Sequence, residues 1–175
     1  MLAVEIMSQR TVIRLFSEAD APEIFPHIAP ITRFMAWQPP ESLEAFSAIW
    51  NTWIPAMRNG TDLHFVVRAQ DDGRFLGLVG LHDLRSRHPE LGIWLRRDAH
   101  GQGLGREVIG AVTTWAARNM TVDYFLYPVA AENMASRRIA EFYGGAVRGE
   151  RPNAKFMAVL YHIPPMTDTP AFRIC

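Results

Sequence analysis

A short glycine-rich segment carries the clearest chemical signal in this sequence. It reads His100-Gly-Gln-Gly-Leu-Gly105 and lies between an apolar run, residues 90–96, and a longer stretch of helical periodicity, residues 105–119. Glycine lets a backbone approach a ligand closely, and the first N–H groups of a helix have no partner within it. Because the helix dipole also favours negative charge, such a loop suits a phosphate group. A tight strand-to-helix turn would use the same residues, so the segment alone leaves both interpretations open.

Two other phosphate-binding motifs fit this loop less well. A dinucleotide-binding fingerprint needs a small residue at position 106, where the sequence has Arg106. A P-loop needs Gly-Lys followed by Ser or Thr, and this triplet does not occur in the sequence.

Titratable side chains that could move protons lie at the ends of predicted strands. Glu90 begins the strand 90–96, and a carboxylate at a strand end is as often an ordinary surface group. His82 ends the strand 75–82 and has an intrinsic pKa suited to proton transfer. His64 and His88 have weaker positional arguments.

Two polar residues stand at the start of a predicted helix over 132–143. Asn133 and Ser136 are three residues apart, so they share one face of that helix. Asn133 could simply cap the helix, which is a common use of asparagine there, and Ser136 could be an ordinary surface residue.

Hydrophobic periodicity predicts the elements that position these residues. Alternating or β-branched runs predict strands, and three-four spacing of apolar residues predicts helices. The predicted strands are 11–16, 63–69, 75–82, 90–96 and 122–129, with two more inside 146–162. The predicted helical segments are 17–28, 41–58, 105–119 and 132–143, with Pro55 expected to kink or shorten the second. This order predicts an α/β protein with a mixed sheet and helices on both faces.

Length and composition are those of one ordinary globular domain. The 175 residues are 49% hydrophobic and 21% charged, which is enough to bury a core without metals or disulfides. We expect a single domain over 1–175, with its core at about 10–163 and an irregular tail at 164–175. Formal net charge is zero, from 18 basic and 18 acidic residues, which disfavours a nucleic-acid partner.

The N-terminal residues and the single cysteine indicate a cytoplasmic protein without a membrane segment. Residues 1–7 have no basic region and no long apolar stretch, so neither a signal peptide nor a membrane span is predicted. One thiol, Cys175, cannot form an internal disulfide, which is typical of a reducing compartment. Because Cys175 is the last residue, it is a poor candidate for a catalytic nucleophile.

The motif in the loop resembles that of the GNAT superfamily of N-acetyltransferases. Members carry Gln/Arg-x-x-Gly-x-Gly/Ala after their fourth strand, and His100-x-x-Gly103-x-Gly105 matches this pattern except at its first position. Other matching segments follow in the expected order between about residues 10 and 163; they are 10–15, 17–20, 37–40, 75–80, 90–95 and 133–138. This order resembles the ribosomal-protein N-terminal alanine acetyltransferases and their relatives.

The resemblance implies a GNAT fold and acetyl-CoA as the acetyl donor. The sheet would be mostly antiparallel, with its fourth and fifth strands splayed apart. Ile93, Trp94 and Leu95 would form the edge that pairs with pantetheine, and a backbone N–H there would polarise the acetyl carbonyl. The residues implied to hold the rest of the cofactor are Asn133 and, at the pyrophosphate, His100, Gly101, Gln102, Gly103, Leu104, Gly105 and Arg106. No metal is implied.

The resemblance also implies roles in proton transfer. Glu90 would deprotonate the acceptor ammonium, often through water, and His82 is a second candidate for this base. Ser136 would protonate the departing CoA thiolate. Many GNAT enzymes use a tyrosine seven residues after the matching asparagine, but that position is Ala140 here. Tyr143 lies too far along the helix to replace it and is expected in the core.

Aromatic side chains are expected to wall the acceptor site. Trp37 and Phe34 lie in the irregular segment 30–40, near the implied substrate entrance, whereas Trp53 is expected in the core. No cluster of acidic residues is evident, which weakens the case for a polyamine. A peptide N-terminus, a small amine and an aminated antibiotic stay open as acceptors.

These features together predict direct transfer of an acetyl group from acetyl-CoA to a primary amine. By resemblance, the leading acceptor is the N-terminal α-amine of a protein. One alternative is a non-catalytic module that senses acetyl-CoA, which Ala140 keeps open; another is an acetyltransferase for a small amine or antibiotic. A toxin-like enzyme acting on aminoacyl-tRNA is disfavoured by the neutral charge. Relatives often dimerise through their late strands, so a homodimer is expected.

Overall fold

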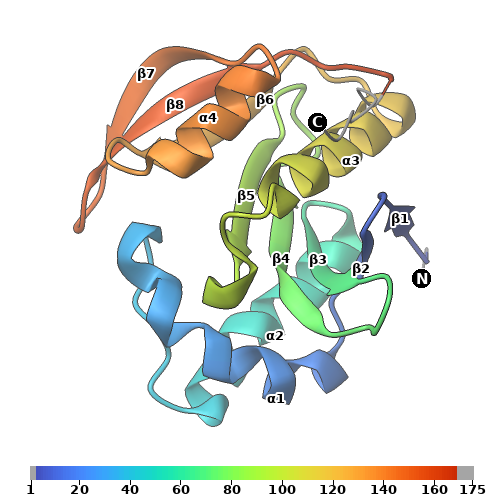
Figure 1. The fold of residues 1–175 in the computed structure, drawn as a ribbon, viewed down its shortest axis with the longest axis vertical. Coiled ribbons are helices and arrows are strands. Elements are labelled where there is room, and N and C mark those ends of the chain that lie inside the picture. The colour runs from blue at the N-terminus through green and yellow to red at the C-terminus, as the bar shows by residue number, and fades with distance from the viewer. Residues whose placement is uncertain (1–2, 169–175) are drawn as a thin grey trace.

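The computed structural model describes residues 3–168, which form an eight-stranded sheet with helices on both faces (Figure 1). The strand order is β1-β2-β3-β4-β5-β6-β8-β7, and neighbours are antiparallel except for the parallel pair β5 and β6. The strands are β1 (Glu5–Met7), β2 (Thr11–Leu15), β3 (Leu63–Ala69), β4 (Phe75–His82), β5 (Glu90–Leu95), β6 (Phe125–Ala130), β7 (Ala146–Pro152) and β8 (Met157–Ile163).

The helices belong to two groups on opposite faces of the sheet. The α-helices are α1 (Ala21–Ile24), α2 (Leu43–Asn59), α3 (Leu104–Asn119) and α4 (Met134–Phe142), and the 3-10 segments are Glu18–Asp20, Phe25–His27, Ala29–Phe34 and Arg97–Ala99. Successive side chains of a strand point to opposite faces. Phe65 and Val67 of β3 accordingly pack in the core beneath α3 and α4, whereas Val66 packs in a second core beneath α1 and α2.

The sheet opens between β5 and β6. These strands share one register pair, Glu90 with Leu126, and the Leu126 N–H donates to the Pro89 carbonyl at 3.0 Å. Beyond this point β6 pairs with β8 along its whole length, so the gap widens from Leu91 towards Leu95 on the β5 side. The splay expected between the fourth and fifth predicted strands is therefore confirmed.

Most predicted elements are present, with three corrections. The short strand β1 precedes the first predicted strand and was not expected. Segment 17–28 is not one helix but a series of short helical turns, and Pro22 and Pro26 each lie in the first turn of a new one. Helix α2 continues through Pro55 to Asn59, because Phe46 and Trp50 bury its apolar face and Gly60 closes it in a left-handed conformation, φ +65°. The predicted tail is described only as far as residue 168, and Cys175 lies outside the described residues.

A buried carboxylate fixes the first helical turns to the sheet. Asp20 is 3% exposed and accepts hydrogen bonds from Arg14 of β2 (2.6 and 3.0 Å), from Arg68 of β3 (2.9 Å) and from the Ser17 backbone N–H (2.9 Å). Burial acts to raise the pKa of Asp20, but these hydrogen bonds outweigh it and lower the pKa to about 2.

Candidate active site

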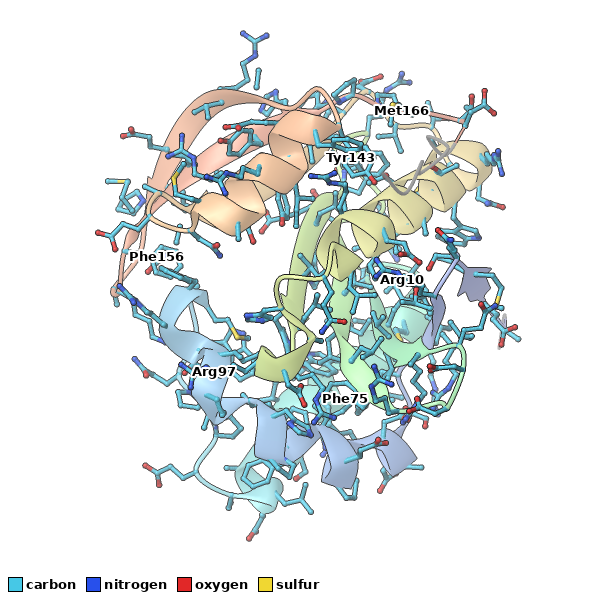
Figure 2. All side chains as sticks on the ribbon, in the orientation of Figure 1. Arg10, Phe75, Arg97, Tyr143, Phe156 and Met166 are labelled. Carbon is cyan, nitrogen blue, oxygen red and sulfur yellow. The ribbon has the colours of Figure 1, made fainter. Side chains whose placement is uncertain are left out.

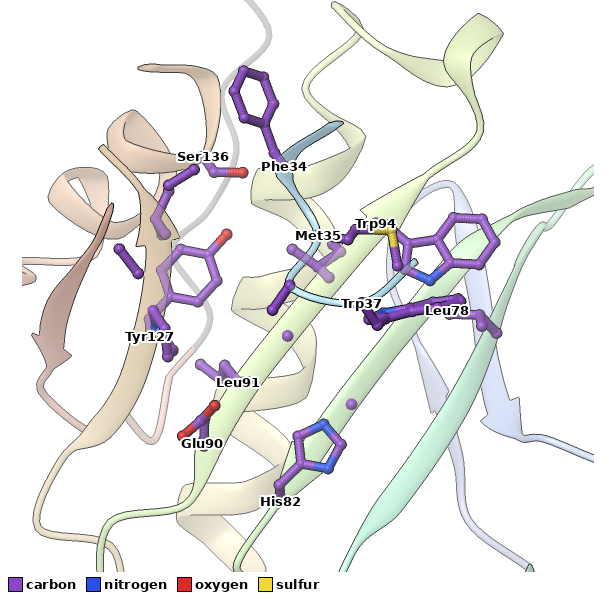
Figure 3. Close-up of a pocket in the computed structure, with 18 of the residues that line it drawn as sticks. Phe34, Met35, Trp37, Leu78, His82, Glu90, Leu91, Trp94, Tyr127 and Ser136 are labelled. Carbon is purple, nitrogen blue, oxygen red and sulfur yellow. The ribbon is translucent and has the colours of Figure 1, made fainter. Parts of the chain in front are cut away.

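A cleft of about 540 Å³ lies at the opening between β5 and β6 (Figure 3). Its walls come from β4 and β5 on one side, from β6 and the start of α4 on the other, and from segment 34–38 across the entrance. The cleft is lined by these residues proposed from sequence: Phe34, Trp37, His64, His82, Glu90, Ile93, Trp94, Asn133 and Ser136. Leu95 and the glycine loop do not line it; they lie where β5 leads into α3.

The glycine loop has the conformation that its sequence predicts. Gly101 and Gly103 both have φ +75°, a left-handed conformation that favours glycine. Gly103 is the N-cap of α3, and the first helical hydrogen bond runs from the Glu107 N–H to the Gly103 carbonyl. The N–H groups of residues 104–106 therefore have no partner within the helix and are free to bind an anion.

Arg10, in the turn between β1 and β2, fastens this loop to the edge of the sheet. Its guanidinium donates to the Gln102 carbonyl at 2.9 Å and to the buried Glu107 carboxylate at 2.8 Å. Figure 2 shows Arg10 beside the start of α3. Ser8 also donates to Glu107, at 2.6 Å, so the loop is held at both ends of its turn. Sequence reasoning did not assign this support to Arg10 and Glu107.

Replacing Gly103 with alanine should weaken acetyl-CoA binding. A side chain at φ +75° is strained by about 1–2 kcal/mol, which corresponds to roughly tenfold in Kd if the binding conformation is lost. Calorimetric titration measures this Kd. Gly60→Ala is the matched control, because it places the same strain (φ +65°) at the end of α2, remote from the loop. Equal affinities for Gly103→Ala and Gly60→Ala would contradict the loop assignment.

The other loop side chains are already engaged within the protein. The Nε2 of His100 lies 2.8 Å from the Leu95 carbonyl, and Gln102 donates to the Asp98 carbonyl at 3.1 Å. The Arg106 guanidinium lies 4.1 Å from the centre of the Phe142 ring. His100 in place of Gln or Arg thus joins the loop to the end of β5.

Asn133 and Ser136 form a polar pair at the start of α4. The Asn133 Oδ1 accepts from the Ser136 N–H and its Nδ2 donates to the Ser136 Oγ, both at 3.2 Å. Asn133 therefore caps the helix and still faces the cleft, so the capping role and a cofactor role are compatible. Because Ser136 Oγ accepts this bond, its hydroxyl proton can be donated elsewhere.

Glu90 lies on the cleft floor and is held by an arginine from β7. Arg151 donates to both carboxylate oxygens, with distances of 3.2–3.3 Å. The carboxylate is 32% exposed, so water can reach it. Arg151 also lines the cleft, which makes it a second charged group beside Glu90 that the sequence did not indicate.

His82 is oriented by a carboxylate that lies just before the neighbouring strand β3. Its Nδ1 lies 3.1 Å from Asp62 Oδ1, which leaves Nε2 free on the cleft side above Gly80. Burial acts to raise the pKa of Asp62, but hydrogen bonds from Thr61 and His82 and the charge of His82 lower it, so Asp62 is ionised. An imidazole held in this way can accept a proton at Nε2.

Aromatic rings line much of the cleft. His64 stacks on Trp53 with ring centres 4.5 Å apart, and burial together with the nearby His82 lowers the pKa of His64 to about 4, so its ring is neutral. Trp53, expected in the core, both packs on the core beneath α2 and lines the cleft. The other aromatic residues that line it are Phe34, Trp37, Phe65, Trp94, Tyr127 and Phe156.

A single lysine closes the entrance of the cleft. Lys155, in the turn between β7 and β8, donates to the Trp37 carbonyl at 2.7 Å and to the Thr32 carbonyl at 3.1 Å. Figure 2 shows the neighbouring Phe156 at the tip of this hairpin, beside the segment Ala29–Phe34. These hydrogen bonds join the β7–β8 turn to the segment around Thr32 and Trp37, which is more than a hundred residues away in sequence.

The position of the missing tyrosine faces away from the cleft. Ala140 is fully buried, and its carbonyl accepts a hydrogen bond from the Gly145 N–H at 2.8 Å. Tyr143 is 2% exposed and donates to the Arg106 carbonyl at 2.6 Å, which confirms its expected place in the core. Sequence reasoning missed a different tyrosine, Tyr127, which lines the cleft from β6.

The family model of the acetyltransferase (GNAT) domain matches residues 10–145, well over half of the chain. This span includes the glycine loop and the opening between β5 and β6. The chain therefore belongs to the GNAT acetyltransferase domain family, and it is an acetyl-CoA-dependent N-acetyltransferase. No curated protein sequence matches it.

Solved structures of acetyltransferases share the fold. RimL, a ribosomal-protein alpha-N-acetyltransferase in complex with coenzyme A, has a TM-score of 0.84 at 18% identity and covers 94% of this chain and 100% of its own. Spermidine N-acetyltransferase from Vibrio cholerae, with CoA and spermine, has a TM-score of 0.76 at 19% identity, covering 89% and 95%. Mycobacterium smegmatis RimJ with CoA-disulfide has a TM-score of 0.79 at 15% identity, covering 93% and 86%. Within residues 3–168, no helix has the length and apolar character needed to cross a membrane.

Proposed function

We propose that this enzyme transfers the acetyl group of acetyl-CoA directly to a primary amine, the leading acceptor being the N-terminal α-amine of a protein. The observation that carries the proposal is the continuity of the β5–β6 gap with an aromatic-walled cleft that contains Glu90 and Ser136. Donor and acceptor would meet in one space, as direct transfer requires.

Different residues along this space would bind the cofactor and transfer protons. The free N–H groups at the start of α3 would hold the cofactor's pyrophosphate, and the unpaired edge at Ile93 and Trp94 would hold its pantetheine. When bound, acetyl-CoA supplies a thioester already activated for attack. Glu90 would take the proton of the acceptor ammonium and Ser136 would give one to the departing sulfur.

The charge of the cleft favours an acceptor with one ammonium over a polyamine. Among the described lining residues, Glu90 is the one carboxylate, and Arg151 already neutralises it. A polyamine carries several positive charges that would need partners, whereas an α-amine followed by an apolar residue suits aromatic walls with one acid. RimL and RimJ among the similar folds are consistent with this choice. A cytoplasmic location and a homodimer stay predictions.

An acceptor panel with thiol detection tests the proposed function. With peptides that have a free N-terminus, the enzyme should release CoA from acetyl-CoA. It should release far less CoA with the same peptides after their N-terminus is blocked, and far less with spermidine. Acetyl-enzyme formed without acceptor would contradict direct transfer. Binding of acetyl-CoA without turnover on any amine would instead identify the sensor module.

A further inference from the structure

The hydroxyl group of Tyr127 is a buried polar group without a partner. Tyr127 lies on β6 and is 2% exposed, and its Oη forms no hydrogen bond with any described residue. An unpaired buried hydroxyl costs about 1–3 kcal/mol. An atom that gained negative charge beside this hydroxyl during a reaction would recover the energy in the transition state.

The other buried tyrosines of the described chain are satisfied. Tyr161 is the register partner of Tyr127 on β8; its hydroxyl accepts from Arg137 at 2.9 Å and lies 2.8 Å from Glu141. Tyr143 donates to a backbone carbonyl. Among the buried tyrosines of the described residues, Tyr127 is therefore the one that lines the cleft and the one whose hydroxyl is unpaired.

The position of this phenol places it at the meeting point of donor and acceptor. In Figure 3 the ring projects from β6 into the space beside β5, with its oxygen directed towards Ser136. Burial raises the pKa of Tyr127 to about 12, although the interaction with the Ser136 hydroxyl opposes that rise. The phenol therefore keeps its proton at neutral pH and can donate it in a hydrogen bond.

We propose that Tyr127 is a catalytic residue whose hydroxyl donates a hydrogen bond to the sulfur of the acetyl donor as the carbon–sulfur bond breaks. The inference rests on the proposed function. As the amine nitrogen bonds to the acetyl carbon, the carbon–sulfur bond breaks and its electron pair stays on sulfur. Tyr127 stabilises that charge while keeping its own proton. Ser136 passes a proton to the sulfur and takes one back from water, and the two protons that the ammonium nitrogen loses leave through Glu90 to solvent. A donor fixed in a largely buried position is well suited to stabilising the charge on sulfur.

The first test is Tyr127→Phe with Tyr161→Phe as the matched control. Loss of one pre-organised donor should lower kcat about 100-fold. The Kd for acetyl-CoA should stay within about twofold, and stability should be unchanged or higher because an unpaired hydroxyl is removed. Tyr161→Phe should do the reverse: it loses satisfied hydrogen bonds and stability, but kcat per folded enzyme is retained.

A second variant separates hydrogen-bond donation from packing. A difluorinated tyrosine at position 127 keeps the ring and hydroxyl but ionises at lower pH. Its kcat should fall at alkaline pH, where the wild type shows no such loss, because the ionised phenol can no longer donate. A merely structural phenol would not change the pH profile.

The outcomes distinguish this inference from the proposed function. If Tyr127→Phe turns over as fast as the wild type, the role of Tyr127 is overturned and the proposed function stands. A Tyr127→Phe variant that loses acetyl-CoA affinity in proportion to activity would place the phenol in cofactor binding and also overturn it. A wild type that releases no CoA with any amine overturns both.

Discussion

Glu90→Gln should lower kcat by about 100-fold with an accepting peptide, while the Kd for acetyl-CoA stays near the wild-type value. Removal of a positioned base typically costs 10²–10⁴ in rate, and the amide cannot accept the ammonium proton. Glutamine retains a carbonyl oxygen for Arg151, so the cleft floor should stay intact. Steady-state rates and calorimetric titration together check this result.

Two further variants decide between the candidate bases. His82→Gln tests the imidazole that Asp62 orients, and His88→Gln is a control because His88 is half-exposed and does not line the cleft. If Glu90 is the base, Glu90→Gln should be the most impaired of the three. If Glu90→Gln is fully active and His82→Gln loses most of its kcat, the general base is His82 and not Glu90.

Asp20→Asn should destabilise the fold by about 2–3 kcal/mol. Breaking a buried ion pair costs about 3–5 kcal/mol, and the loss here is smaller because Arg68 keeps its contact with Glu23 at 2.8 Å. Urea unfolding at neutral pH measures the change. Asp72→Asn removes an exposed partner of Arg74 and should leave the unfolding midpoint unchanged.

The contribution of Asp20 should also disappear in acid. Its folded pKa, about 2, lies below the ordinary value of 3.8, so the stabilisation is fully present above about pH 4. It is lost as the pH falls from about 4 to about 2, and the two-unit difference corresponds to about 2.5 kcal/mol. The Asn variant should therefore lose less stability than the wild type over this range; parallel curves would contradict the assignment.

Local patterns account for the features that the sequence predicted correctly. The glycines at 101 and 103 are needed for left-handed backbone, and the periodicities at 63–69, 75–82 and 105–119 each report one buried face. These signals lie within a few neighbouring residues. They were sufficient for the strands and helices and for the loop at α3, whereas the opening between β5 and β6 was predicted from the family resemblance.

The missed features depend on contacts between distant segments. Arg151 meets Glu90 across 61 residues, and Asp62 meets His82 across 20, neither of which a local pattern indicates. Tyr127 follows Phe125 and precedes Val129 with the spacing of a buried strand face, so it resembles an ordinary core residue. The one available signal was its hydroxyl, since a buried tyrosine needs a partner and the sequence cannot show whether it has one.

Lys155 has a consequence for the enzyme's own susceptibility to acetylation. It is the only lysine in the 175 residues, and its ammonium is shared between the carbonyls of Thr32 and Trp37. Reaction of this amine with an acyl donor would require both hydrogen bonds to break. This acetyltransferase thus has one side-chain amine of its own, that of Lys155. Its hydrogen bonds join the two segments at the entrance of the cleft.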